Sequence, residues 1–317
     1  MTGHVAKGCL AVQESEADTR YASVMQFDPH VLYTVPEALT PAQQQMVDTL
    51  ATLEPAFIDA GRIARELQGR VDVEMKADTG NLLADVVTRA DREVQARIVK
   101  TICDCKPLTE CHLLAEETLD GQAGELQSRF TIGAPLMLTI DPIDGTKRYT
   151  ENKPYYSTII GLHDAVRPLY TFIHYPAFAW WVRIVDRHLE MSGPCPEKLD
   201  HLELSNTIVY TAGRPEQDIP KLAGDLANHG VSIRNGESVG PYGSKFLYLT
   251  GHAGGYYARN PNAYDGLFAL HCALARGNTV LAEGRAPGAS LCLQDTVIGK
   301  HGASHPGWYV VVPRAAH

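Results

Sequence analysis

Two carboxylates stand at the end of a predicted buried strand, in the segment LTIDPIDGTKRYTE (residues 138–151). Asp141 and Asp144 are three residues apart, with a proline between them and a glycine directly after them, so a turn is predicted there. The backbone N–H groups of Gly145 and Thr146 then open a predicted helix, where an anion is favoured. Carboxylates in pairs bind hard cations, but the same residues are ordinary turn formers. The segment therefore predicts a cation site or a simple strand-to-turn junction.

Other acidic residues also lie at the ends of predicted elements. Asp91 is near the start of a predicted helix, Glu116 and Glu117 follow the apolar segment HLLA, and Asp265 begins the predicted helix YDGLFALHCALARG. Each has a structural explanation as well, because the helix dipole favours a negative charge at a helix N-terminus and turns often carry solvated acids. Considered together, the acidic residues favour a single site over separate structural roles.

The run DPIDGT resembles the DPxDGT signature of the inositol monophosphatase family of metal-dependent phosphatases, and TRAD, AEET and a later Tyr-Asp pair occur in the order of that family. The resemblance covers roughly residues 40 to 315. It implies a mixed α+β and α/β fold, a layered αβαβα sandwich, and two or three Mg²⁺ ions. Two cations roughly 3.5 to 4 Å apart can activate a water and stabilise the departing oxygen of a phosphate monoester.

The resemblance implies metal ligands that all bind through an oxygen atom: Glu116, Asp141, the Ile143 carbonyl, Asp144 and Asp265. Asp141 would bridge two ions, Glu116 would bind the first, and Asp144 and Asp265 would bind the second. Lithium or calcium would inhibit by competing for that second position.

The resemblance also implies the residues that act on the substrate. Asp91 and the Thr146 hydroxyl would orient and activate the attacking water, and Glu117 would support them. Phosphate contacts would come from Gly145, Thr146 and Lys76. Contacts to the rest of the substrate would come from Arg259, Tyr264, Ser244 and Lys245.

Departures from the inositol-specific pattern bear on the substrate. The chain reads DGTKRY instead of DGTTNF, and Ala258 and Arg259 lie where an acidic residue would hold sugar-like hydroxyls. VEMKAD and DGTKRYTENKPYYSTIIGL resemble histidinol-phosphate phosphatases, whereas Tyr257-Ala258-Arg259 resembles a motif of 3′-phosphoadenosine 5′-phosphate nucleotidases. Ala115, Gly255 and the segment YDGLFAL depart from all of these relatives, which indicates a reshaped pocket.

We therefore expect a Mg²⁺-dependent phosphatase that hydrolyses a small phosphate monoester, such as a phosphorylated amino alcohol, sugar or polyol. The alternatives are a 3′(2′),5′-bisphosphate nucleotidase and an inositol monophosphatase. An alternative of another class is a protein that binds a phosphorylated ligand without turnover.

Hydrophobic periodicity predicts the elements that position these residues. A helix begins at Thr40-Pro41, and a second helix buries Ala90, Val94, Ile98 and Ile102. Strands follow at HLLAEET, LMLTID, YYSTIIGLHD, PLYTFIHYP and AWWVRIVD, after which helices and strands alternate. We predict an N-terminal extension (1–39), an α+β sub-domain with the metal site (40–190) and an α/β sub-domain that completes the cleft (191–317).

Composition excludes several classes of partner. The chain has 317 residues with 28 basic and 37 acidic side chains and no basic run, so a nucleic acid polymer is not expected. No segment reaches the about 18 apolar residues of a membrane span, and the first residues lack a signal-peptide pattern. We expect a cytoplasmic protein with reduced cysteines, and a homodimer is left open.

Overall fold

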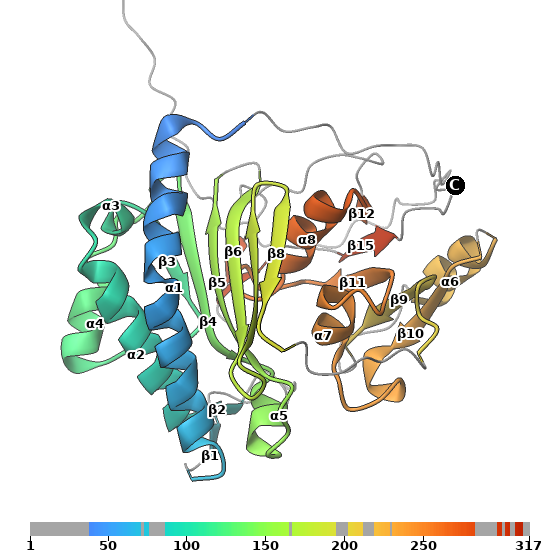
Figure 1. The fold of residues 1–317 in the computed structure, drawn as a ribbon, viewed down its shortest axis with the longest axis horizontal. Coiled ribbons are helices and arrows are strands. Elements are labelled where there is room, and N and C mark those ends of the chain that lie inside the picture. Colours follow the sequence, from blue (N-terminus) through green and yellow to red (C-terminus); the bar gives the residue numbers. More distant parts are fainter. Residues whose placement is uncertain are drawn as a thin grey trace, which may run out of the picture.

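The computed structural model describes residues 38–70, 73–75, 86–164, 167–194, 202–211, 219–228, 230–282, 297–299, 302–304 and 308–312. Two large sheets, of six and five strands, alternate with helices in this part of the chain, in the order helices, sheet, helices, sheet, helix (Figure 1), and two further sheets have two strands each. The predicted αβαβα sandwich is confirmed. Almost all of the predicted extension 1–39, and Lys76, lie outside the described residues.

The first helical layer contains α1 (Pro41–Leu67) and α2 (Arg89–Cys103). Thr40 is the N-cap of α1, as predicted: its hydroxyl accepts from the Gln43 backbone N–H at 3.2 Å, and the Gln43 side chain accepts from the Thr40 N–H at 2.9 Å. The four apolar residues predicted for the buried face of α2 are all fully buried. Both helices pack on one face of the first sheet. None of the helices in the described ranges is long and apolar enough to cross a membrane.

The first sheet has the strand order β3-β4-β5-β6-β7-β8. Its strands are β3 (His112–Ala115), β4 (Met137–Asp144), β5 (Ser157–His163), β6 (Pro168–Tyr175), β7 (Trp180–Val185) and β8 (His188–Ser192). β3 is parallel to β4, and the rest form the predicted antiparallel meander. Four short elements lie nearby: α3 (Lys106–Thr109) and α4 (Gly121–Gln127) contact α2, and β1 (Val73–Met75) pairs with β2 (Val86–Thr88), which also contacts α2.

The second sheet has the order β10-β9-β11-β15-β12. Its strands are β9 (Thr207–Tyr210), β10 (Ser232–Asn235), β11 (Gly255–Arg259), β12 (Thr279–Ala282) and β15 (Trp308–Val312). The remaining elements are α5 (Thr146–Thr150), α6 (Ile219–Ala227), the 3-10 turn η1 (Gly236–Ser238), α7 (Ser244–Leu249), α8 (Phe268–Arg276), β13 (Val297–Gly299) and β14 (Gly302–Ser304). One boundary was predicted wrongly: Asp265 lies in a turn, and α8 begins only at Phe268.

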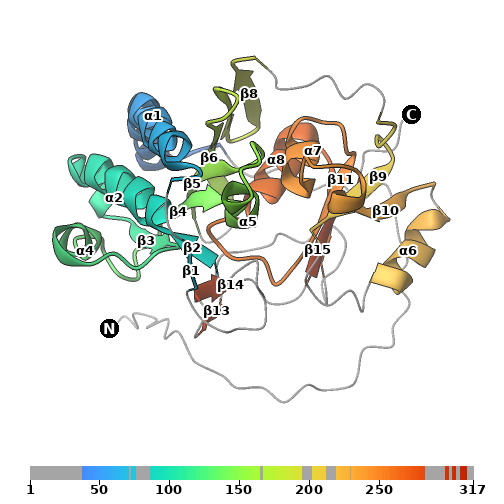
Figure 2. The same cartoon turned by 90° about the horizontal axis from the view of Figure 1, so that it is seen from below.

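The middle helices join the two sheets. α8 contacts β6, β7 and β8 on one side and β12 and β15 on the other, and Figures 1 and 2 both show α7 and α8 between the sheets. Arg276, at the end of α8, donates to the carbonyl oxygens of Tyr248 and Leu249 at 2.5 and 2.6 Å, which satisfies the C-terminus of α7. Strands of the first sheet end at Ser192 and those of the second begin at Thr207, while the division at residue 190 stays a prediction.

Two fully buried histidines cross-link this core. His163 is hydrogen-bonded to Thr139 at 3.1 Å, and His271 to Thr171 at 2.8 Å and to the Asp186 carbonyl at 2.9 Å. Burial lowers the pKa of both imidazoles to about 3. In the unfolded chain each would take up a proton near pH 6.5, so the stability that the neutral rings contribute is complete above that pH and is lost as the pH falls.

We expect the unfolding free energy to fall by about 1.4 kcal/mol per pH unit for each such histidine between pH 6 and 4. His163→Gln should remove one histidine's share of this slope, whatever its effect on stability at pH 7. Urea unfolding of both proteins at several pH values measures the difference. Parallel slopes for wild type and variant would mean that His163 titrates normally in the folded protein.

Candidate metal centre

Three aspartates bring carboxylate oxygens within 4.8 Å of one another: Asp141, Asp144 and Asp265. The first two lie at the end of β4, and the third lies in the turn between β11 and α8. Residues three apart on a regular strand face opposite sides of a sheet. Here the register shifts, because Asp141 pairs with Ile159 and Asp144 pairs with Ser157, which leaves one extra residue on β4. This bulge brings both side chains to the same site.

The bulge is held by hydrogen bonds to its own carbonyl oxygens. The Thr158 hydroxyl donates to the Pro142 carbonyl at 2.8 Å, and the Thr146 hydroxyl donates to the Ile143 carbonyl at 3.0 Å. Gly145 follows with a φ of +87°, a conformation that favours glycine, and directs the chain into α5. A carbonyl oxygen has two lone pairs, so Ile143 retains one for another partner.

The predicted pair for water activation is also adjacent. Asp91, in the first turn of α2, is fully buried, and its Oδ1 lies 3.5 Å from the Thr146 hydroxyl. The Thr146 hydroxyl therefore lies between the Asp91 carboxylate and the β4 bulge. This position fits the predicted role, which stays a prediction.

Lys245 lies inside the acidic cluster, although the sequence had suggested a substrate contact. Its ammonium nitrogen is 2.5 Å from Asp144 Oδ1 and 3.0 Å from Asp265 Oδ2. Burial by itself lowers the pKa of Lys245, but the carboxylates of Asp144, Asp265 and Asp141 outweigh it and hold the pKa well above its usual range. The ammonium is therefore charged at neutral pH.

The cluster retains more negative charge than this lysine neutralises. Burial raises the pKa of Asp141 well above its usual range, and the charges of Glu116 and Asp144 add to the effect. Among the described residues, Asp141 Oδ1 and Asp265 Oδ1 are buried and have no hydrogen-bond partner. Buried carboxylate oxygens without donors are costly, and hard oxygen ligands of this kind are those that Mg²⁺ prefers. The donor set fits a divalent cation.

Glu116 and Glu117 enter the site from the end of β3. The Glu116 backbone N–H donates to the Ile140 carbonyl at 3.0 Å, which sets it beside β4. The fully buried side chain of Gln95 then clamps the next residue: it donates to the Glu117 carbonyl at 2.5 Å and accepts from the Glu117 N–H at 2.9 Å. Gln95 was missed by sequence reasoning, although it lies four residues after Asp91 and so shares its helix face.

The other predicted substrate residues are less directly connected to the acids. Burial raises the pKa of the Tyr264 phenol, and the negative charges of Glu116 and Asp265 raise it further. The phenol therefore lies near the acidic cluster and is neutral. Ser244 is buried and accepts from the Thr211 hydroxyl at 3.3 Å. Arg259 is half-buried at the end of β11. Arg148, which was not predicted, packs against Gly243 and lies 3.5 Å from Glu237.

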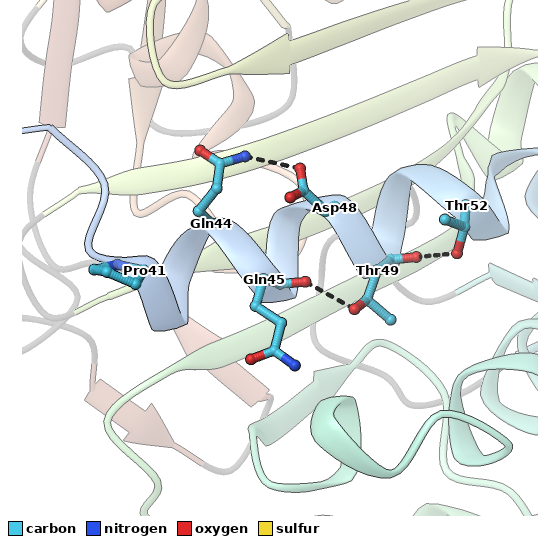
Figure 3. Close-up of a pocket in the computed structure, with 6 residues that line it drawn as sticks. All are labelled: Pro41, Gln44, Gln45, Asp48, Thr49 and Thr52. Atoms are coloured by element: carbon cyan, nitrogen blue, oxygen red, sulfur yellow. Dashed lines mark hydrogen bonds between the residues drawn. The ribbon is translucent and has the colours of Figure 1, made fainter.

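A shallow hollow on the outer side of α1 is separate from these residues (Figure 3). Gln44, Asp48 and Thr49 line part of it, and their polar groups bond within the helix: Gln44 donates to Asp48 at 2.8 Å and Thr49 to the Gln45 carbonyl at 2.7 Å. No residue predicted for the site lines this hollow. The acidic cluster is therefore the better candidate.

Comparison with known proteins gives two kinds of match. Residues 46–217 match the family model described as the inositol monophosphatase family. A histidinol-phosphatase of Streptomyces coelicolor is 30% identical over 110 residues, which cover 30% of this chain and 41% of that protein. The sequence match thus spans less than half of that relative's length.

Solved structures share the fold at low sequence identity. An inositol monophosphatase (IMPase) of Thermotoga maritima has a TM-score of 0.58 and 19% identity, over 84% of this chain and 92% of that chain. An IMPase/NADP phosphatase complexed with Mg²⁺ and phosphate has a TM-score of 0.57 and 18% identity, over 87% and 93%.

Proposed function

Because the chain belongs to the inositol monophosphatase family of metal-dependent phosphatases, we propose that it is a Mg²⁺-dependent phosphoric monoester hydrolase acting on a small phosphorylated metabolite. One observation carries the proposal to this site: Asp141, Asp144 and Asp265 converge within 4.8 Å, and two of them retain buried oxygens without hydrogen-bond donors among the described residues. A turn junction would not require three acids from two separate segments to converge, one of them buried and the other two half-buried.

Asp141, Asp265 and Glu116 would hold Mg²⁺, and the carboxylate of Asp144 would add negative charge beside it. When bound, the metal would neutralise phosphate charge and favour ionisation of the attacking water. Asp91 and the Thr146 hydroxyl would orient that water, and the Asp91 carboxylate would accept a proton from the water. The water oxygen forms a new bond to phosphorus as the ester P–O bond breaks, and the leaving alkoxide takes up a proton, which gives an alcohol and inorganic phosphate.

The residues around the phosphate would set its orientation. The backbone N–H groups of Gly145 and Thr146 would donate to phosphate oxygens. Gln95 supports the site from behind, because its two hydrogen bonds fix the backbone of Glu117 to the helix that carries Asp91. The water-activating residues and the acidic pair after β3 are in this way held as one unit.

Histidinol phosphate is our first candidate substrate. The sequence segments that resemble histidinol-phosphate phosphatases and the match to the Streptomyces coelicolor protein support it. A 3′(2′),5′-bisphosphate is the second candidate, favoured by Arg259 at the end of β11. Inositol phosphate and binding without turnover are the remaining alternatives.

The test is phosphate release from histidinol phosphate, 3′-phosphoadenosine 5′-phosphate and inositol 1-phosphate, each with Mg²⁺. We expect turnover of at least one, with the highest kcat/KM for histidinol phosphate. Asp91→Asn should abolish turnover of every accepted substrate, since it removes the proton acceptor. Binding of these compounds without phosphate release by the wild type would favour the non-catalytic alternative.

Arg259→Ala should discriminate between substrates. If the guanidinium contacts a second anionic group, the substitution raises KM for a bisphosphate, because charge-assisted hydrogen bonding of about 1.5 to 3 kcal/mol is lost. KM for a monoester with a neutral tail stays almost unchanged. Arg234→Ala, at an exposed position of β10, removes the same charge and is the matched control. Equal effects on both substrates would place Arg259 outside the specificity pocket.

A further inference from the structure

We propose that the ammonium group of Lys245 is a built-in cation that takes the second cation position of the acidic cluster, so that the chain binds one Mg²⁺ fewer than a variant without this lysine. The inference rests on the proposed function, since it concerns the metal requirement of the same site. It also reverses the expected role of Lys245, from a substrate contact to a structural part of the metal centre.

The contacts of the ammonium group carry the first step. Lys245 Nζ lies 2.5 Å from Asp144 Oδ1 and 3.0 Å from Asp265 Oδ2. These two aspartates are the pair that the family resemblance assigns to the second ion. An ammonium group that bridges both carboxylates from inside the cluster occupies the space in which that ion would have to sit.

The second step compares the individual carboxylate oxygens. Asp144 is satisfied by protein donors at both oxygens, because Oδ1 accepts from Lys245 and Oδ2 from the Ser157 hydroxyl at 3.3 Å. Asp141 Oδ1 and Asp265 Oδ1, by contrast, are buried without a donor among the described residues. The oxygens that still lack a cation are thus ones that Lys245 does not contact, which leaves a single cation position for a metal ion.

The surroundings of the ammonium group suit an organic cation better than a metal ion. Lys245 Nζ lies 5.6 Å from the ring centroid of the buried Phe268. The face of an aromatic ring attracts an ammonium group, whereas it offers no ligand to Mg²⁺, which requires near-octahedral oxygen coordination. Phe268 is the first residue of α8, three residues after Asp265, so the same short segment supplies a carboxylate and a ring to this lysine.

The test is the number of Mg²⁺ ions bound per chain, measured by isothermal titration calorimetry on metal-stripped protein without substrate. Wild type should bind one Mg²⁺. Lys245→Ala, which removes the cation and leaves space, should bind two. Its affinity for the second Mg²⁺ should be at least tenfold higher than any affinity of wild type for a second Mg²⁺. Lys245→Arg keeps the positive charge and should retain the wild-type stoichiometry.

Lys245→Met serves as a second variant of similar length should the alanine variant fail to fold, which circular dichroism would reveal; it too should gain an ion. An equal number of Mg²⁺ ions bound per chain in wild type and in the neutral variants would overturn the inference, because a metal ion would then displace the Lys245 ammonium group from this position. Wild type that binds no Mg²⁺ at millimolar concentrations would contradict the proposed function as well, so the two failures are distinguishable.

Discussion

Replacement of Asp141 by asparagine is expected to lower kcat/KM for phosphate release at least about a thousandfold, which corresponds to about 4 kcal/mol of barrier. Asp141 is almost completely buried, and its Oδ1 has no donor among the described residues, so it is the strongest candidate to hold the catalytic cation. Asparagine has nearly the same shape but lacks the negative charge that binds a metal ion.

The fold should survive this substitution. Asp141 is crowded by the charges of Glu116 and Asp144, and removal of one of several apposed buried charges relieves repulsion in metal-free protein. Thermal unfolding in EDTA should therefore occur at the wild-type temperature or above it. Asp104→Asn, at an exposed site just after α2, is the control for the loss of one carboxylate. A decrease in kcat/KM of less than about tenfold, or about 1.4 kcal/mol, would make Asp141 a turn residue only.

The elements of the fold followed largely from local patterns. The N-cap at Thr40 and the 3.6-residue apolar spacing of α2 are signals that a few neighbouring residues contain, and both predictions are confirmed. β8 was not predicted, since its residues are mostly exposed at a sheet edge and show no apolar alternation. The start of α8 was misplaced because Asp265 resembles a helix-initiating acid, whereas it belongs to the preceding turn.

The site was less accessible to sequence reasoning, because its geometry depends on contacts between distant segments. The order of acidic motifs identified Asp141, Asp144 and Asp265, which the structure brings together. The position of Lys245 could not be deduced, since it depends on how α7 packs beside the β4 bulge, 101 residues away in sequence from Asp144. The role of Gln95 could not be predicted for the same reason: it binds the backbone of Glu117, and a backbone partner leaves no pattern of residue types in the sequence.

Removal of Mg²⁺ is expected to abolish activity and to lower thermal stability together. In excess EDTA we expect phosphate release to fall at least about a hundredfold, or about 2.7 kcal/mol, because buried carboxylates repel a phosphate unless a cation lies between them. Addition of Mg²⁺ beyond the chelator should restore the rate. Undiminished hydrolysis in EDTA would contradict the proposed mechanism.

The thermal effect follows from mass action. Mg²⁺ at a hundred times its dissociation constant stabilises the folded state by about 2.7 kcal/mol, which for a chain of this size raises Tm by about 4 °C. The same titration on Asp141→Asn isolates the site, because that variant lacks the carboxylate whose Oδ1 is left without a donor among the described residues. Its Tm should respond to Mg²⁺ much less than that of wild type. An equal rise in both proteins would mean that the ion binds elsewhere on this acidic chain, since general screening of surface charge does not depend on Asp141.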